Sequence, residues 1–165
     1  MIQLRIINGP EITEIKERNV ACVSFIGNYL GNAEVFRGLF EKLCGWAFDK
    51  QLMGSDTVLL SAYYDDPNVT PPEKLRLDVC MTIQDDVEVD GEIKKKKLPG
   101  GTYAVMRVEL TGAEEYGPAW GMIHEWVTQN NLTIDLSRAS YEVYLNNPEE
   151  HPEKYHVLDI CLSVE

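Results

Sequence analysis

The pattern of apolar and polar positions divides the chain into six strand candidates and two helix candidates. The strand candidates are short runs rich in β-branched and aromatic residues, bounded by Gly, Pro, Asn and Asp. They are residues 20–27, 57–64, 75–83, 102–110, 139–145 and 157–164. One helix candidate separates the first strand candidate from the second, and the other separates the fourth from the fifth.

Both helix candidates place apolar residues at steps of three and four. The first carries Phe36, Leu39, Phe40, Leu43 and Trp46, with Asn32 as the predicted N-cap, and the second carries Trp120, Ile123, Trp126 and Val127, with Pro118 in its first turn. A helix with one apolar stripe must cover one face of a sheet, so the sequence predicts an α+β fold.

Two sequence patterns recur with a separation of 81 residues. "YYDDP" at 63–67 corresponds to "YLNNP" at 144–148, and "LDVCMTI" at 77–83 corresponds to "LDICLSV" at 158–164. The sequence therefore predicts one domain over 1–165, built from two pseudo-twofold βαββ repeats that share a mostly antiparallel sheet. The repeats cover approximately 1–84 and 98–165, and a hairpin connector with an Asp90-Gly91 turn spans 85–97.

Glu142 is an acidic residue inside the strand candidate "YEVYL". Side chains alternate across a strand, so Glu142 and Tyr144 share one face, and the repeat relates them to Ser61 and Tyr63. We expect the helices on one face of the sheet and a ligand cleft on the other, where these two pairs approach each other. An aromatic cleft with one carboxylate suits a flat, apolar cation. The alternative is that Glu142 is solvated on an open sheet face.

Composition and charge narrow the class of protein. The chain has 165 residues, 44% of them apolar, and a net charge of −12 spread along its length. An acidic surface repels phosphate backbones, so we expect no direct binding to nucleic acids. No run of residues matches a membrane span or a signal peptide, which predicts a cytoplasmic protein without membrane contact. The "IKKKK" run at 93–97 is interpreted as a solvated loop face.

The remaining polar and sulfur-bearing residues indicate no metal site and no cofactor. Cys22, Cys44, Cys80 and Cys161 lie far apart in apolar surroundings and are interpreted as reduced core residues. The three histidines, at 124, 151 and 156, are scattered and suggest no catalytic triad. Asp78 and Asp159 repeat in register and are interpreted as residues that cap turns or anchor backbone. "NGPE" at 8–11 and "LPGG" at 98–101 are interpreted as turns.

Taken together, the segments 62–83, 98–108 and 141–164 resemble the GyrI-like small-molecule-binding family. This family includes the DNA gyrase inhibitory protein and the effector-binding domains of AraC-type and MerR-type multidrug regulators. The resemblance implies a duplicated βαββ fold with a cleft between the halves. It also implies that Glu142 is the acidic residue that meets the ligand, and that Tyr144, Tyr63 and Trp120 line the pocket. The repeat adds Ser61 to the expected ligand-binding residues.

Three functions follow from these observations. The leading one is a stand-alone protein that binds hydrophobic, planar or cationic small molecules, in which Glu142 holds the charge of the ligand and the aromatic residues clamp its plane. A helix-turn-helix extension is not expected. The second, implied by the resemblance, is a hydrolase that opens cyclopropane-type toxins with Glu142 and Tyr144 as catalytic residues. The third is an interaction partner of DNA gyrase, for which the acidic surface would suit a basic partner.

Overall fold

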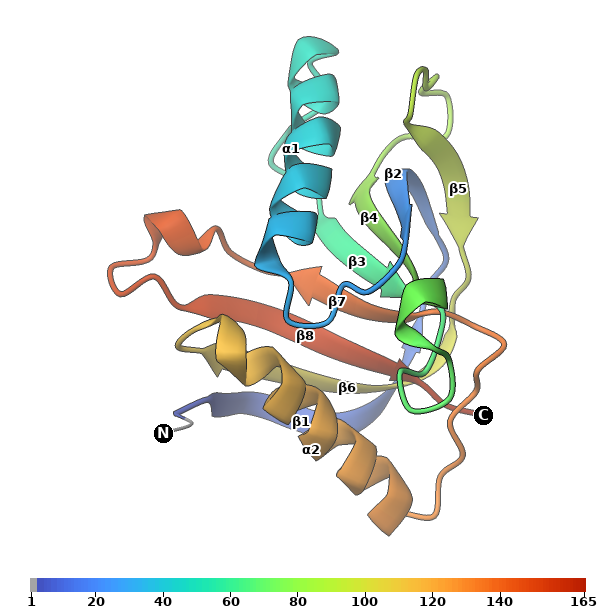
Figure 1. The fold of residues 1–165 in the computed structure, drawn as a ribbon, viewed down its shortest axis with the longest axis vertical. Coiled ribbons are helices and arrows are strands. Elements are labelled where there is room, and N and C mark those ends of the chain that lie inside the picture. Colours follow the sequence, from blue (N-terminus) through green and yellow to red (C-terminus); the bar gives the residue numbers. More distant parts are fainter. Residues whose placement is uncertain (1–2) are drawn as a thin grey trace.

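The computed structural model describes residues 3–165, which form one eight-stranded antiparallel sheet and two long helices (Figure 1). The strands are β1 (Arg5–Ile15), β2 (Arg18–Ile26), β3 (Leu59–Tyr63), β4 (Arg76–Thr82), β5 (Lys94–Leu98), β6 (Gly101–Leu110), β7 (Ser140–Tyr144) and β8 (His156–Ser163). The helices are α1 (Ala33–Asp49) and α2 (Tyr116–Gln129), and three short 3-10 turns, η1 (Pro72–Lys74), η2 (Ala113–Glu115) and η3 (Pro148–Glu150), complete the fold.

The strand order in the sheet is β1-β6-β8-β7-β3-β4-β2-β5. Each strand of the first half has a counterpart four numbers later, and counterparts lie at equal distances from the centre of the sheet, so the order is symmetric about its middle. The central strands β3 and β7 pair with each other. The edge strands are exchanged between the halves, because β1 pairs with β6 and β5 pairs with β2. The predicted antiparallel α+β fold, its six strands and its two helices are confirmed.

The two edge strands were not predicted. β1 contains the "NGPE" segment, which lies where the pairing with β6 shifts register between Asn8 and Glu11, so its interpretation as a turn is wrong. β5 is the lysine run "KKKKL", which pairs with β2 and does not form the predicted hairpin or a loop. Lysines on an edge strand discourage pairing with another chain, which explains why a strand can carry this composition.

The link between β5 and β6 passes very close to the link between β1 and β2. A side chain at Gly100 would overlap the backbone of Ile15 and Glu17, so glycine is required at this crossing. The interpretation of "LPGG" as a turn is wrong, because the antiparallel register continues from the pair Arg18–Leu98 to the pair Ile15–Gly101 through this link.

Both helices pack on the same face of the sheet. α1 buries Leu39, Leu43 and Ala47 over β2 and β4, and α2 buries its equivalent stripe over β6 and β8. In Figure 1 the two helices lie apart, each over its own half of the sheet. The central strands β3 and β7 therefore lie between the two helices.

The predicted placement of the cleft opposite the helices is wrong. Tyr141 and Val143 pack on the helix-free face with Leu60 and Tyr103, in a core cluster that draws residues from both halves of the sheet. Because the sheet twists strongly, as its strand directions in Figure 1 show, these apolar residues bury one another without a helix. Glu142, on the other face of β7, consequently lies on the helix side.

Asp78 and Asp159 do not cap turns, contrary to the sequence interpretation. Asp78 lies inside β4, where it accepts hydrogen bonds from Ser24 and Tyr64 and forms an ion pair with Lys96. The side chain of Asp78 is 2% exposed, whereas that of Asp159, which pairs with Arg107, is 18% exposed. The repeat thus preserves an acidic position within a strand but surrounds it differently in the two halves.

The four cysteines are free thiols, and Cys22, Cys80 and Cys161 are buried as predicted. Cys44 is only half-buried, on the side of α1 that borders the cleft described below. Neither helix of the described chain is both long and apolar enough to cross a bilayer.

Candidate functional site

Glu142 lies at the pseudo-twofold axis of the molecule. It is paired directly with Ser61 across the central strands β7 and β3, and the repeat offset of 81 residues relates the same two positions. The axis therefore passes between Ser61 and Glu142. Their difference in chemistry gives the centre of the site a single carboxylate.

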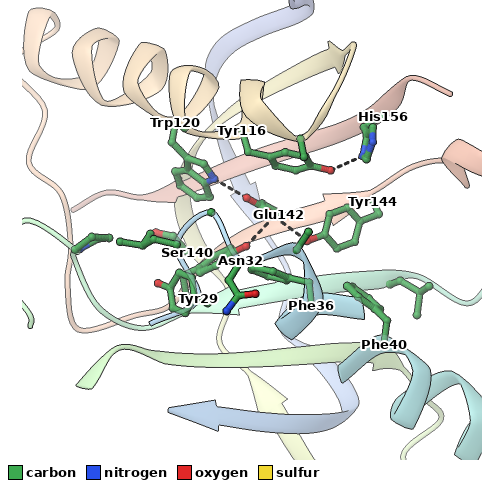
Figure 2. Close-up of a pocket in the computed structure, with 18 of the residues that line it drawn as sticks. Tyr29, Asn32, Phe36, Phe40, Tyr116, Trp120, Ser140, Glu142, Tyr144 and His156 are labelled. Atoms are coloured by element: carbon green, nitrogen blue, oxygen red, sulfur yellow. Dashed lines mark hydrogen bonds between the residues drawn. The ribbon is translucent and has the colours of Figure 1, made fainter. Parts of the chain in front are cut away.

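The carboxylate of Glu142 accepts three hydrogen bonds from uncharged donors (Figure 2). Trp120 Nε1 donates to Oε2 at 2.7 Å, while the hydroxyls of Tyr63 and Tyr144 donate to Oε1 at 2.8 and 2.7 Å. Glu142 is only 4% exposed. No Lys, Arg or His among residues 3–165 forms an ion pair with it. The protein thus solvates a buried carboxylate with neutral groups alone.

Burial raises the pKa of Glu142, because desolvation disfavours the charged form more than its three hydrogen bonds favour it. Burial and the nearby carboxylate also raise the pKa values of Tyr63 and Tyr144 well above the ordinary tyrosine value. Both phenols therefore keep their protons and act as donors to Glu142.

Ser61 supports the site from behind and does not line the cleft. It is fully buried, and its Oγ lies 2.7 Å from the hydroxyl of Tyr144. Since Tyr144 donates its proton to Glu142, Ser61 must be the donor to Tyr144. The structure therefore brings together Ser61, Tyr63, Trp120, Glu142 and Tyr144, but only the last four face the cleft.

Aromatic rings from the two helices contact the tyrosines of the opposite half of the sheet. Phe40 of α1 meets Tyr144 edge-on with ring centroids 5.6 Å apart, and Trp120 of α2 meets Tyr63 in the same way at 5.8 Å. These two contacts are related by the pseudo-twofold axis. They close the sides of a cleft of about 1630 Å³ between the helices.

Further aromatic residues of the cleft were not identified as site residues from the sequence. They are Tyr29, Phe36, Phe40, Tyr64 and Tyr116. Phe36 and Phe40 had been assigned to the apolar helix stripe only. The buried stripes of α1 and α2 are offset by 80 residues, which relates Phe40 to Trp120, so an alignment of the two helices would have identified Phe40 from the predicted site residue Trp120. Tyr29 follows β2 in a loop and has no such signal.

The charges of the cleft are mostly negative. Asp65, Asp66, Glu114 and Glu149 lie along it in addition to Glu142. Its two arginines, at 37 and 138, are paired with acidic residues of their own segments. Within residues 3–165 no three His, Cys, Asp or Glu side chains converge as a metal-ligand set. The site is suited to an organic cation held by rings and one carboxylate.

Comparison with known proteins identifies relatives over almost the whole chain. Residues 9–165 match the profile of the GyrI-like small molecule binding domain. The DNA gyrase inhibitor of Escherichia coli (strain K12) is 30% identical over 158 residues, covering 94% of this chain and 96% of the relative. A putative transcriptional regulator of Bacillus subtilis (strain 168), the SPbeta prophage-derived YosT, is 34% identical over 74% of this chain and 80% of its own.

Solved structures share the fold at lower sequence identity. The C-terminal domain of EcmrR superposes with a TM-score of 0.70 at 16% identity, covering 100% of this chain and 98% of that domain. This chain spans 57% of the longer EcmrR chain in a DNA complex. SAV2435 bound to tetraphenylphosphonium gives a TM-score of 0.61 at 12% identity, with 94% and 93% of the two chains covered. A hydrolase from Listeria innocua gives 0.56 at 15% identity, with 94% and 91% covered.

Proposed function

Because this chain belongs to the GyrI-like small molecule binding domain family, we propose that its cleft binds a bulky aromatic or hydrophobic organic cation, with Glu142 as the counter-charge. One observation carries this proposal. The carboxylate at the centre of the aromatic cleft is buried and held only by neutral donors. A ligand that brings a positive charge would supply the missing partner.

The energetics favour a cation over a neutral ligand of the same shape. A buried carboxylate without a charged partner is costly, and a cation placed beside it relieves that cost where solvent screens little. The faces of tyrosine and tryptophan rings add cation–π attraction. Tetraphenylphosphonium, the ligand of the structurally similar SAV2435, has this chemistry and provides a suitable probe.

Calorimetric titration of the wild-type protein tests the proposal. We expect tetraphenylphosphonium to bind and triphenylphosphine oxide, which has similar rings and no charge, to bind at least about tenfold more weakly. Affinity for the cation should fall as the pH is lowered from about 8 to about 5, because the raised pKa of Glu142 lets the carboxyl become neutral earlier than an exposed glutamate. Equal affinity for both compounds would contradict the proposal.

Binding to DNA gyrase is a second candidate function. It is supported by the name of the E. coli relative, a DNA gyrase inhibitor that aligns over 94% of this chain. We expect the purified protein to inhibit DNA supercoiling by gyrase, and the inhibition to weaken with salt if acidic surface groups make the contact. Glu142→Gln, which changes only a buried charge, should inhibit equally. Full supercoiling at low salt with excess protein would exclude this function.

The hydrolase alternative, with Glu142 and Tyr144 as catalytic residues, has one supporting observation. That observation is the fold shared with the L. innocua hydrolase, and similarity of fold at 15% identity does not carry an activity. Mass analysis of the ligand recovered after titration would show directly whether it had been converted.

A further inference from the structure

We propose that Tyr116 and His156 form a second polar anchor in the same cleft, which binds a neutral hydrogen-bond acceptor, such as an ester or amide carbonyl, carried by the cationic ligand. This inference rests on the proposed function of the cleft and adds the class of ligand that it prefers. It assigns a role to a histidine that the sequence pattern left without one.

The two residues come from different elements and meet inside the cleft. Tyr116 is the first residue of α2 and His156 is the first residue of β8, and both line the cleft. The Tyr116 hydroxyl lies 2.7 Å from His156 Nδ1, and the rings meet edge-on with centroids 5.5 Å apart. Figure 2 shows the pair on the same side of the cleft as Trp120, with Tyr116 between Trp120 and His156.

The direction of this hydrogen bond depends on the tautomer of His156. We assign the tautomer in which the phenol donates and Nδ1 accepts, because the other tautomer leaves the phenol proton without an acceptor in the described chain. Burial raises the pKa of Tyr116 and lowers that of His156, which keeps both groups neutral. A neutral imidazole that accepts at Nδ1 carries its proton at Nε2. No group of residues 3–165 accepts a hydrogen bond from Nε2, so this donor is available to a ligand.

The surroundings of the pair select a neutral acceptor. Glu114 and Glu149 are the carboxylates that act on His156 from η2 and η3, and both disfavour an anion at this end of the cleft. Glu142 influences the adjacent Tyr116 from β7. The cleft, at about 1630 Å³, exceeds the usual size of a site for one drug-like molecule, which leaves room for a ligand to reach both anchors.

A matched pair of dyes tests the inference. Tetramethylrosamine and tetramethylrhodamine methyl ester are both cations with the same aromatic body, and they differ in one ester group. We expect wild-type protein to bind the ester about threefold to tenfold more tightly, the range of one added hydrogen bond. His156→Leu should abolish this preference, and the ratio of the affinities for the two dyes, not the affinity for either dye alone, is the measured quantity. Tyr116→Phe, which releases the fixed tautomer, should reduce the preference without changing ring packing.

The outcomes separate this inference from the function on which it rests. Equal binding of the two dyes by wild-type protein would overturn the inference and leave the proposed function standing. An ester preference that persists in both His156→Leu and Tyr116→Phe would also overturn it. Failure of both dyes to bind would overturn the proposed function, and the inference with it. Thermal unfolding of each variant identifies any loss of fold, and Tyr116→Phe supplies the test if His156→Leu does not fold.

Discussion

Substitution of Glu142 by Gln is expected to weaken binding of tetraphenylphosphonium by about 10-fold to 100-fold. The change removes a buried charge but keeps the size of the side chain and an acceptor oxygen. An interaction of a charged group in such a place contributes about 1.5–3 kcal/mol, which corresponds to this loss of affinity. Because the site is shielded from solvent, added salt should not abolish the difference between the two proteins. Calorimetric titration at neutral pH measures it.

Glu149→Gln is the matched control, because it removes the same charge from the same cleft at a position where the side chain is 85% exposed. Exposed charges are well screened, and we expect its affinity to change less than about twofold. If the two variants lost affinity equally, the general negative charge of the cleft, and not the carboxylate of Glu142, would be responsible for attracting the cation.

Substitution of Asp78 by Ala is expected to lower the free energy of unfolding by about 2–3 kcal/mol. It leaves Tyr64, Ser24 and Lys96 without their shared acceptor in a place where Asp78 itself is only 2% exposed. This expected loss of unfolding free energy is smaller than the loss for a fully buried ion pair, because the side chain of Lys96 is 38% exposed. Chemical denaturation of the variant and the wild type measures this difference.

The internal repeat supplies the control for this prediction. Asp159→Ala makes the same change at the equivalent position, where the acid pairs with a half-exposed Arg107, and it should cost less than about 1 kcal/mol. Equal losses for the two variants would show that the position within the strand, and not the cluster around Asp78, determines the stability.

The sequence predicted the repeated architecture because the repeat preserves residues that pack. The recurrence of "LDVCMTI" as "LDICLSV" marks β4 and β8, whose apolar residues must fit beneath equivalent helices. The edge strands do not have to fit beneath a helix, so the repeat does not preserve their residues. β1 and β5 pair on one side only, so a bulged segment and a run of lysines are both compatible with a strand there.

The sequence predicted the residues that contact Glu142, but not the other aromatic residues of the cleft or the face of the sheet on which the cleft lies. Glu142 was found because a carboxylate is unusual inside a strand, and the repeat then located Tyr63, Tyr144 and Ser61. Which face of β7 meets the helices depends on the twist of the whole sheet, since Tyr141 and Val143 find apolar partners on β3 and β6 without any helix. Alternation along one strand separates two faces but does not say which of them is covered.

Glu142 lies on the pseudo-twofold axis, at a position that a homodimer of identical halves could not fill with a single carboxylate. In a homodimer of identical halves, whatever residue occupied this position would face its own copy. A glutamate would then sit against a second glutamate, and two buried like charges resist ionisation together. Covalent fusion of the halves permits Ser61 on one side and Glu142 on the other. The fused chain can therefore hold a single carboxylate at the centre of a nearly symmetric protein.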